Sequence, residues 1–166
     1  MAFYIVIRGP AGIGKTTISK IIAENINAEY ISLDEKLHED DLDKIKGKCI
    51  PEERFLKANE KTIPETINLL KQNKNVVLDG NFYSKSHLED LIARVNSKHF
   101  IFTLKSTLED CLIRNKTRPN KKDILNDSII RKIHKLVNKF DFGQNIDTHN
   151  KSESEVVDEI LHYLKD

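Results

Sequence analysis

The sequence predicts an α/β fold in which helices cover both faces of one parallel, five-stranded sheet. First, short apolar runs typical of buried strands alternate along the chain with longer segments whose apolar residues recur at helical spacing. Second, a glycine-rich turn joins the first of these runs to the segment that follows it. Third, a length of 166 residues and a hydrophobic content of 39% suit a single domain with a substantial core.

Five segments are expected to be strands because they are apolar or rich in β-branched and aromatic residues. They span residues 3–7, 29–33, 76–78, 99–104 and 145–148. The first helix is expected over about 14–26, where an apolar stripe is formed by Ile18, Ile21, Ile22 and Ile26. Residues 35–50 read as polar and irregular. Pro51 can begin the next helix, and Pro64 is expected to interrupt or restart it.

The helices of the second half are predicted from apolar faces and capping signals. Ser106-Thr107-Leu108-Glu109 is a capping box, which predicts a helix that includes Arg114 and Arg118 and stops before Pro119. Ser152 and Glu155 are expected to cap the last helix. Apolar faces of two further helices are formed by Leu88, Leu91, Ile92 and Val95, and by Ile129, Ile133, Val137 and Phe140.

The glycine-rich turn matches the pattern G-x-x-x-x-G-K-[ST], the phosphate-binding P-loop. Glycine lets backbone N–H groups surround an anion, and the helix that begins near the last glycine adds its positive end. We expect Lys15 to reach the β- and γ-phosphates of a nucleotide and the hydroxyl of Thr16 to serve Mg²⁺. An ordinary strand–helix turn would not explain the Lys-Thr pair. The expected nucleotide-binding residues of this turn are Gly9, Ala11, Gly12, Ile13, Gly14, Lys15, Thr16 and Thr17.

Two carboxylates follow other predicted strands, at the sheet edge where open α/β proteins bind ligands. Asp79 comes after an apolar strand and can hold Mg²⁺ through its water shell, although Asp-Gly is also a common turn. Asp34 follows the second strand and is a candidate general base for an attacking hydroxyl, or simply a helix cap. Both should lie near the P-loop.

Charge is distributed unevenly although the net charge is only +1. Residues 34–43 contain six acidic residues and one lysine, and residues 114–139 contain nine basic residues against two acidic ones. Solvated helix faces are the simple interpretation of both stretches. For the second stretch the alternative is a lid that closes over a nucleotide, in which Arg114 and Arg118, four residues apart, clamp the transferring phosphoryl group.

Other patterns exclude several classes of protein. Asn120-Lys121-Lys122-Asp123 resembles a guanine-binding signature, but it follows no apolar strand and no D-x-x-G occurs. Asp141-Phe142-Gly143 lacks the catalytic loop of protein kinases. The two cysteines form no metal-spaced cluster, and neither a secretory signal nor an apolar span of about 20 residues is visible. We therefore expect a cytoplasmic protein with no membrane partner.

The loop, Asp34, Leu78-Asp79-Gly80-Asn81-Phe82 and the spaced arginines together resemble the small P-loop kinases related to zeta toxins, gluconate kinases, chloramphenicol phosphotransferases and polynucleotide kinases. The resemblance covers nearly the whole chain. It implies a three-layer α/β/α P-loop kinase fold, with one domain over residues 1–166, an acceptor-binding insertion over about 35–63 and a helical lid over about 114–131. It also implies ATP as phosphate donor, Mg²⁺ as cofactor and a hydroxyl group as acceptor.

The resemblance also implies roles for individual residues. Lys15 would bind phosphates, Asp34 would be the base or an acceptor ligand, and Arg114 and Arg118 would act from the lid, with Arg114 also touching the nucleotide. Thr16 and Asp79 would serve the metal, and Thr148 would lie by the adenine. The resemblance assigns no signature within residues 35–63, where Arg54 stands out by itself as a candidate ligand for an anionic acceptor; acceptor contacts are thus expected from Asp34, Arg54 and Asn81.

The resulting hypothesis is an ATP-dependent phosphotransferase that acts on a hydroxyl of a small molecule or nucleotide. Two alternatives stay open. The basic stretch suits a polynucleotide 5′-hydroxyl kinase, and an ATP-gated binding module without turnover would use the P-loop alone. The acceptor and the oligomeric state do not follow from the sequence.

Overall fold

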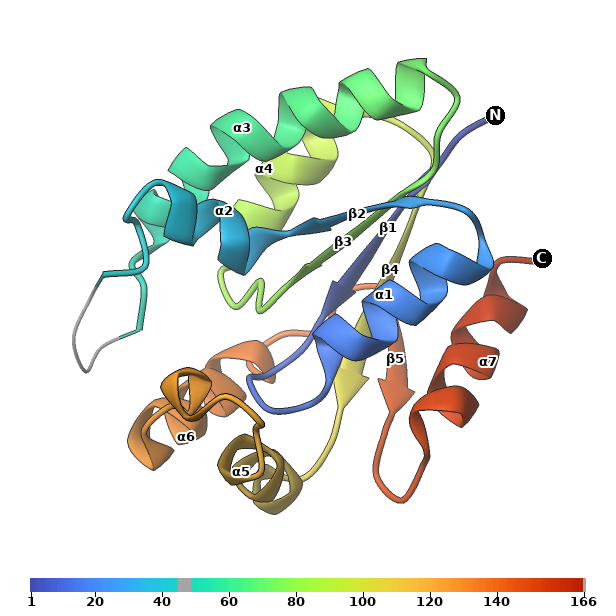
Figure 1. Ribbon diagram of the computed structural model, residues 1–166. Coiled ribbons are helices and arrows are strands. Elements are labelled where there is room, and N and C mark those ends of the chain that lie inside the picture. Colours follow the sequence, from blue (N-terminus) through green and yellow to red (C-terminus); the bar gives the residue numbers. More distant parts are fainter. Residues whose placement is uncertain (45–48, 166) are drawn as a thin grey trace.

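The computed structural model describes residues 1–44 and 49–165, and their strands form one sheet in which every neighbouring pair is parallel (Figure 1). The order across the sheet is β2-β3-β1-β4-β5. The bounds are β1 Tyr4–Arg8, β2 Glu29–Ser32, β3 Val76–Gly80, β4 His99–Lys105 and β5 Gln144–Asp147. The chain is thus α/β with the five parallel strands expected from its alternating apolar segments.

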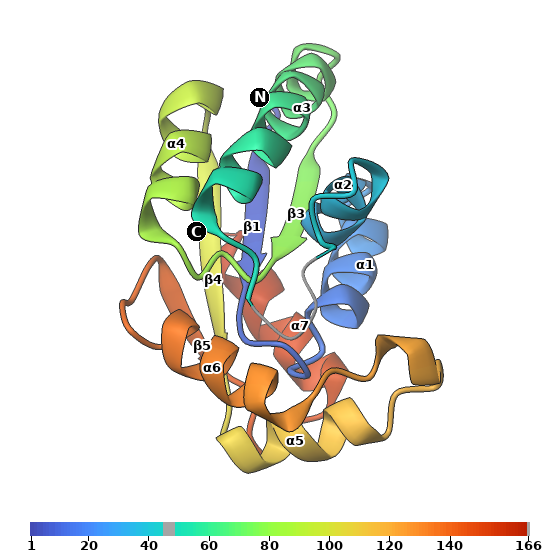
Figure 2. The same ribbon diagram turned by 90° about the vertical axis from the view of Figure 1, so that its left-hand side faces the viewer.

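The helices form two layers and a cap. In Figure 1, α1 and α7 cover one face of the sheet and α3 and α4 the other, while α5 and α6 lie across the carboxyl ends of the strands; Figure 2 shows the same from the side. Their bounds are α1 Lys15–Asn25, α2 Leu33–Glu39, α3 Glu52–Lys71, α4 Lys85–Val95, α5 Leu108–Lys116, α6 Asp127–Val137 and α7 Glu153–Tyr163. A short 3₁₀ turn spans Lys121–Asp123.

The two faces of the sheet carry separate hydrophobic cores because side chains alternate along each strand. Ile5 and Ile7 of β1 point into the core beneath α1 and α7, whereas Tyr4 and Val6 point into the core beneath α3 and α4. All four side chains are fully buried. This layering leaves the carboxyl edge of the sheet, where α5 and α6 lie, as the place where loops from β1, β2 and β3 meet.

Arg8 is a charged residue inside this framework and is fully buried at the end of β1. Its guanidinium donates to the carbonyls of Val137 at 2.9 Å and Phe140 at 3.3 Å, and to the hydroxyl of Thr103 at 3.1 Å. It also stacks over the ring of Phe140. Arg8 therefore satisfies carbonyls at the end of α6 and fixes that helix to the strand that leads into the P-loop.

Two expectations for the first half of the chain are wrong. Part of the segment expected to be irregular is helix α2, because Ser32 caps it by accepting from the Glu35 N–H and Leu37 is buried on its inner face. Residues 45–48 of that segment lie outside the described residues. Pro64 does not interrupt α3, which is continuous; Pro64 is exposed while its neighbour Ile63 is buried, so packing on either side offsets the lost backbone hydrogen bond.

Three boundaries in the second half also differ from expectation. The residue that caps α5 is Thr107, not Ser106, and its hydroxyl accepts from the Asp110 N–H. Helix α5 ends at Lys116, so Arg118 does not share a helix face with Arg114. Helix α6 ends at Val137, and Phe140 lies beyond it against Arg8. None of the helices in the described ranges is long and apolar enough to cross a membrane.

Candidate active site

The P-loop connects β1 to α1 and takes the backbone conformation that its glycines permit. Gly12 has φ +83° and Gly14 has φ +97°, both in the left-handed region that side chains disfavour. A Cβ on Gly12 would lie 2.4 Å from the carbonyl oxygen of Cys111 in α5. Glycine at this position is therefore required by both conformation and space. Helix α1 begins one residue after Gly14, with its N-terminus directed toward the loop.

Lys15 is held inside the loop by two oxygen acceptors. Its ammonium donates to the carbonyl of Pro10 at 2.9 Å and to Oδ1 of Asn81 at 3.1 Å, and the residue is only 7% exposed. Burial lowers the pKa of Lys15, while Asp34 and Asp79 raise it. The cation thus sits between the P-loop and the end of β3, close to the two carboxylates expected to share its site.

Asp79 is the penultimate residue of β3, beside the strand that leads into the P-loop, and is 1% exposed. In the sheet register it lies beside Ile7 of β1 and Ser32 of β2. The hydroxyl of Tyr30 donates to its Oδ2 at 2.8 Å. Burial raises the pKa of Asp79 and the nearby Lys15 cation lowers it. The position is where the strand order reverses around β1 and β3, which is the ligand-binding crevice of open α/β sheets.

Asp34 and Arg54, expected on the acceptor side, lie in different surroundings. Asp34 is exposed in the first turn of α2, near enough to raise the pKa of Lys15. Arg54 lies in α3 and donates to the carbonyls of Leu42 at 2.8 Å and Asp41 at 3.5 Å. Arg54 thus ties α3 to the segment after α2, and its use as an anion ligand would require it to leave these carbonyls.

The two arginines assigned to a lid make separate contacts. Arg114 of α5 donates to the carbonyl of Ile13 at 2.9 Å, which joins α5 to the P-loop. Arg118 donates to the carbonyl of Asp123 at 2.9 Å. Its charge nevertheless lowers the pKa of Lys15. Arg114 thus contacts the P-loop directly, whereas Arg118 bonds within its own segment, and the two do not share the helix face that their spacing predicted.

Thr148, assigned to the adenine side, is 1% exposed and already has a hydrogen-bond partner. Its hydroxyl donates to the carbonyl of Lys105 at 3.1 Å, and its backbone N–H donates to the same oxygen at 2.8 Å. These bonds join the end of β4 to the segment after β5. Contact between Thr148 and a base would therefore involve its carbonyl or methyl group rather than its N–H or hydroxyl.

The donor set at this edge fits Mg²⁺, which keeps most of its waters and takes few protein ligands alongside substrate phosphates. Thr16 is exposed at the start of α1, and the hydroxyl of Thr16 and the carboxylate of Asp79 lie close enough that Thr16 lowers the pKa of Asp79. Within residues 1–44 and 49–165, no cluster of three or more histidine, cysteine or acidic side chains could cage a metal. An ion here would depend on the phosphates that accompany it.

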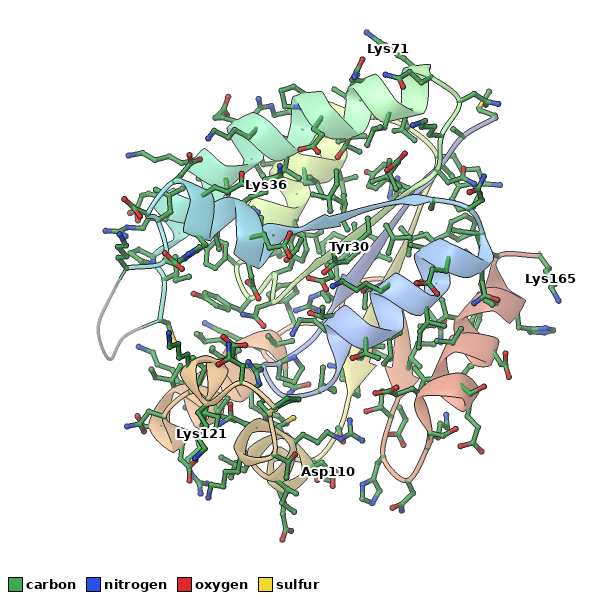
Figure 3. All side chains as sticks on the ribbon, in the orientation of Figure 1. Tyr30, Lys36, Lys71, Asp110, Lys121 and Lys165 are labelled. Atoms are coloured by element: carbon green, nitrogen blue, oxygen red, sulfur yellow. The ribbon has the colours of Figure 1, made fainter. Side chains whose placement is uncertain are left out.

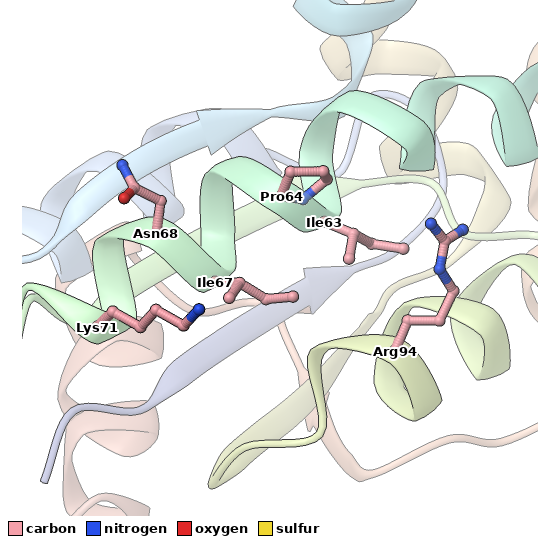
Figure 4. Close-up of a pocket in the computed structure, with 6 residues that line it drawn as sticks. All are labelled: Ile63, Pro64, Ile67, Asn68, Lys71 and Arg94. Atoms are coloured by element: carbon pink, nitrogen blue, oxygen red, sulfur yellow. The ribbon is translucent and has the colours of Figure 1, made fainter.

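A hollow of about 540 Å³ lies elsewhere, between the later part of α3 and the end of α4 (Figure 4). It is lined by Ile63, Pro64, Ile67, Asn68, Lys71 and Arg94. Those residues belong to the face opposite α1 and none comes from the P-loop. The chemistry of the carboxyl edge, with its backbone donors and buried charges, identifies the site better than this open groove does.

Tyr30 is the residue of this cluster that the sequence did not identify, because it reads as an ordinary strand residue. A signal was available in the period-two alternation: Tyr30 and Ser32 lie on the same face of β2, which the register pairs with Val77 and Asp79 on β3. Figure 3 shows Tyr30 in the space between the sheet and α1. Finding this contact from sequence would have required the strand pairing to be known.

Comparison with known proteins agrees with this geometry. A family model described as an AAA domain matches residues 5–140. A protein of Thermococcus kodakarensis named "Putative adenylate kinase" is 31% identical over 166 residues, covering 97% of this chain and 85% of that protein. A similarly named protein of Thermococcus gammatolerans is also 31% identical, with the same coverage.

A solved structure with the same fold is a sugar kinase from Janibacter sp. HTCC2649, with a TM-score of 0.84 at 14% identity, over 99% of this chain and 95% of that chain. The low identity means that this likeness concerns the fold alone. The family model and the relatives carry the assignment. The chain belongs to the AAA domain family and is one of the small P-loop kinases that its motifs resemble.

Proposed function

We propose that this protein transfers the γ-phosphoryl group of ATP to a hydroxyl group of a small molecule or nucleotide. The observation that carries the proposal is the P-loop with Gly12 and Gly14 at positive φ, inside which buried Lys15 donates to Pro10 and to Asn81, two residues after the buried Asp79. A phosphate-binding cation and a carboxylate for the metal are recurring parts of phosphoryl-transfer sites, and Asp34 in the first turn of α2 is the proposed group for the attacking hydroxyl.

Each residue then has a defined task. Backbone N–H groups of the loop and the ammonium of Lys15 bind the phosphates, with Lys15 exchanging the oxygens of Pro10 and Asn81 for phosphate oxygens. Thr16 and Asp79 would hold Mg²⁺, and the bound ion would neutralise charge on the phosphates. Asp34 is exposed toward solvent and free to orient an incoming hydroxyl and accept its proton. Arg114 and Arg118 add positive charge at the same loop.

Acceptor-dependent release of ADP tests this proposal. Purified protein with MgATP would be screened against sugars, nucleosides, aminoglycoside-like antibiotics and AMP, which is included because the relatives are named as adenylate kinases. We expect ADP release that depends on one hydroxyl-bearing acceptor class and falls about 10²-fold in the Asp34→Ala variant. Release with AMP alone, whose acceptor atom is a phosphate oxygen, would contradict transfer to a hydroxyl and favour an adenylate kinase activity. ATP binding without acceptor-dependent release across the panel would contradict the proposal and favour an ATP-gated binding module.

A polynucleotide 5′-hydroxyl kinase is the second candidate, and one observation favours it. Arg131, Lys132 and Lys135 are exposed on α6, and none of the ion pairs among the described residues involves them. Such cations can bind a phosphate backbone in a salt-dependent manner. Transfer of labelled γ-phosphate to a 5′-hydroxyl oligonucleotide would support this candidate, and absent or salt-independent oligonucleotide binding would exclude it.

A further inference from the structure

Tyr30 makes a contact that the functions assigned above do not use. It lies on the edge strand β2, half-buried, and its side chain faces the layer that contains α1. The ammonium of Lys20 in α1 lies 5.4 Å from the centre of its ring. From this position the hydroxyl donates to Oδ2 of Asp79, in the neighbouring strand β3, at 2.8 Å.

The acceptor of this hydrogen bond is the carboxylate of Asp79, which is shielded from solvent. Asp79 is 1% exposed, and a buried carboxylate is costly unless donors satisfy its oxygens. The Tyr30 hydroxyl binds one oxygen, Oδ2, and so fixes the plane in which Oδ1 lies. A single torsion of the Asp79 side chain would otherwise decide which way its oxygens face.

We propose that Tyr30 is a positioning residue for magnesium, whose hydroxyl holds the Asp79 carboxylate in the orientation that receives the hydrated cation of MgATP. The inference rests on the proposed function, because it takes Asp79 as the metal-holding carboxylate. It adds a residue outside the P-loop and its motifs to the metal site. Groups that orient metal ligands typically change metal affinity by about 10- to 100-fold when removed.

The Tyr30→Phe variant tests this inference because it removes one oxygen atom and keeps the ring. ATP affinity would be measured by calorimetry in EDTA and again at several Mg²⁺ concentrations. We expect unchanged ATP affinity in EDTA and a Mg²⁺ requirement raised about tenfold. Binding of Mn²⁺ in the presence of a non-hydrolysable ATP analogue, followed by electron paramagnetic resonance, should weaken by a similar factor.

Tyr83→Phe is the matched control. Tyr83 is also half-buried, and its hydroxyl donates to the carbonyl of Ile50 rather than to Asp79. This variant should leave the Mg²⁺ requirement unchanged. Thermal unfolding of each variant would reveal any loss of fold, and an equal loss of ATP affinity with and without Mg²⁺ in Tyr30→Phe would mean a packing role and overturn the inference.

A double-mutant cycle with Asp79→Asn separates positioning from packing without depending on the stability of one variant. If Tyr30 acts through Asp79, then adding Tyr30→Phe to Asp79→Asn should change the Mg²⁺ requirement no further. Additive effects would overturn the inference. If the wild type and Tyr30→Phe show the same Mg²⁺ dependence, only this inference fails; if the wild type does not bind MgATP, the proposed function fails with it.

Discussion

The two sides of the crevice at the carboxyl edge differ in how their charged residues are held. On the nucleotide side, Lys15 and Asp79 are almost fully buried and have hydrogen bonds of 2.8 to 3.1 Å to partners outside their own elements. On the side proposed for the acceptor, formed by α2 and α3, charged residues form ion pairs near the surface, such as half-buried Lys36 with exposed Glu65 at 2.9 Å. Asp34 is exposed there.

This difference explains why the nucleotide can be inferred and the acceptor cannot. Binding a phosphate requires a particular backbone conformation, in which Gly12 and Gly14 have positive φ. Because other residues disfavour that conformation, the requirement is visible in the sequence as glycines at these positions. Exposed ion pairs such as those of α2 and α3 occur on most protein surfaces and contribute about 0–1 kcal/mol each. They therefore carry little information about a ligand.

The largest expected effect comes from breaking the nucleotide side. Lys15→Ala removes the buried cation from between the P-loop and β3, and turnover should fall by about 10³-fold or more because charge on the transferring phosphoryl group loses its partner. ATP affinity, measured by calorimetry, should fall as well. Lys71→Ala, at the exposed end of α3, is the control and should change neither quantity. Unchanged ATP affinity in Lys15→Ala would contradict the assignment of the loop.

Breaking the acceptor side should separate binding from chemistry. Asp34→Ala is expected to reduce acceptor-dependent ADP release about 10²-fold, the usual contribution of a general base, while ATP affinity stays within a factor of about two. Glu35→Ala removes the next carboxylate of the same exposed turn and should retain activity. Equal losses in the two variants would show that the charge of α2, rather than Asp34 itself, matters.

A buried histidine of α4, His87, gives a prediction of how the stability of the protein depends on pH. His87 of α4 is fully buried, stacked on Phe82 with ring centres 4.8 Å apart, and its Nε2 lies 2.9 Å from Oδ1 of Asn59. Burial lowers the pKa of His87 to about 4, against a partly compensating effect of Asp90. An unfolded histidine titrates near about 6.5.

Between these pH values His87 binds a proton in the unfolded chain but not in the folded protein. Protonation therefore favours the unfolded state, and the free energy of unfolding decreases as the pH falls from about 6.5 to about 4. The loss should reach about 3 kcal/mol, with full stability recovered above pH 6.5. Urea unfolding of wild type and His87→Gln over this range measures it as the difference between their pH slopes. Parallel slopes would mean that folding does not lower the pKa of His87.

The smallest expected effect comes from the surface ion pairs of the acceptor side. Lys36→Ala removes the pair with Glu65 between α2 and α3 and a longer contact with Glu39 at 3.8 Å, and should change the free energy of unfolding by less than about 1 kcal/mol. ATP affinity should not change. A loss of several kcal/mol, or a loss of acceptor binding alone, would show that this pair does more than join two helices at the surface.

Local patterns predicted the strands, the P-loop and the two strand-end carboxylates because each depends on neighbours in the sequence. Helix α2 was missed since its run of acidic residues obscured the Ser32 cap and the buried pair Leu33 and Leu37. The contacts of Arg8 with α6 and of Tyr30 with Asp79 join residues far apart in the chain. No spacing rule within one segment reveals such contacts, and both depend on the strand order.

Hydrogen–deuterium exchange of the wild-type protein with and without MgATP tests the central claim most directly. If the P-loop wraps the phosphates, the amides of residues 9–17, apart from Pro10, which has none, should exchange more slowly when MgATP is added, while those of the α3 segment near Lys71 keep their rates. Unchanged exchange over residues 9–17 at millimolar MgATP would contradict the account.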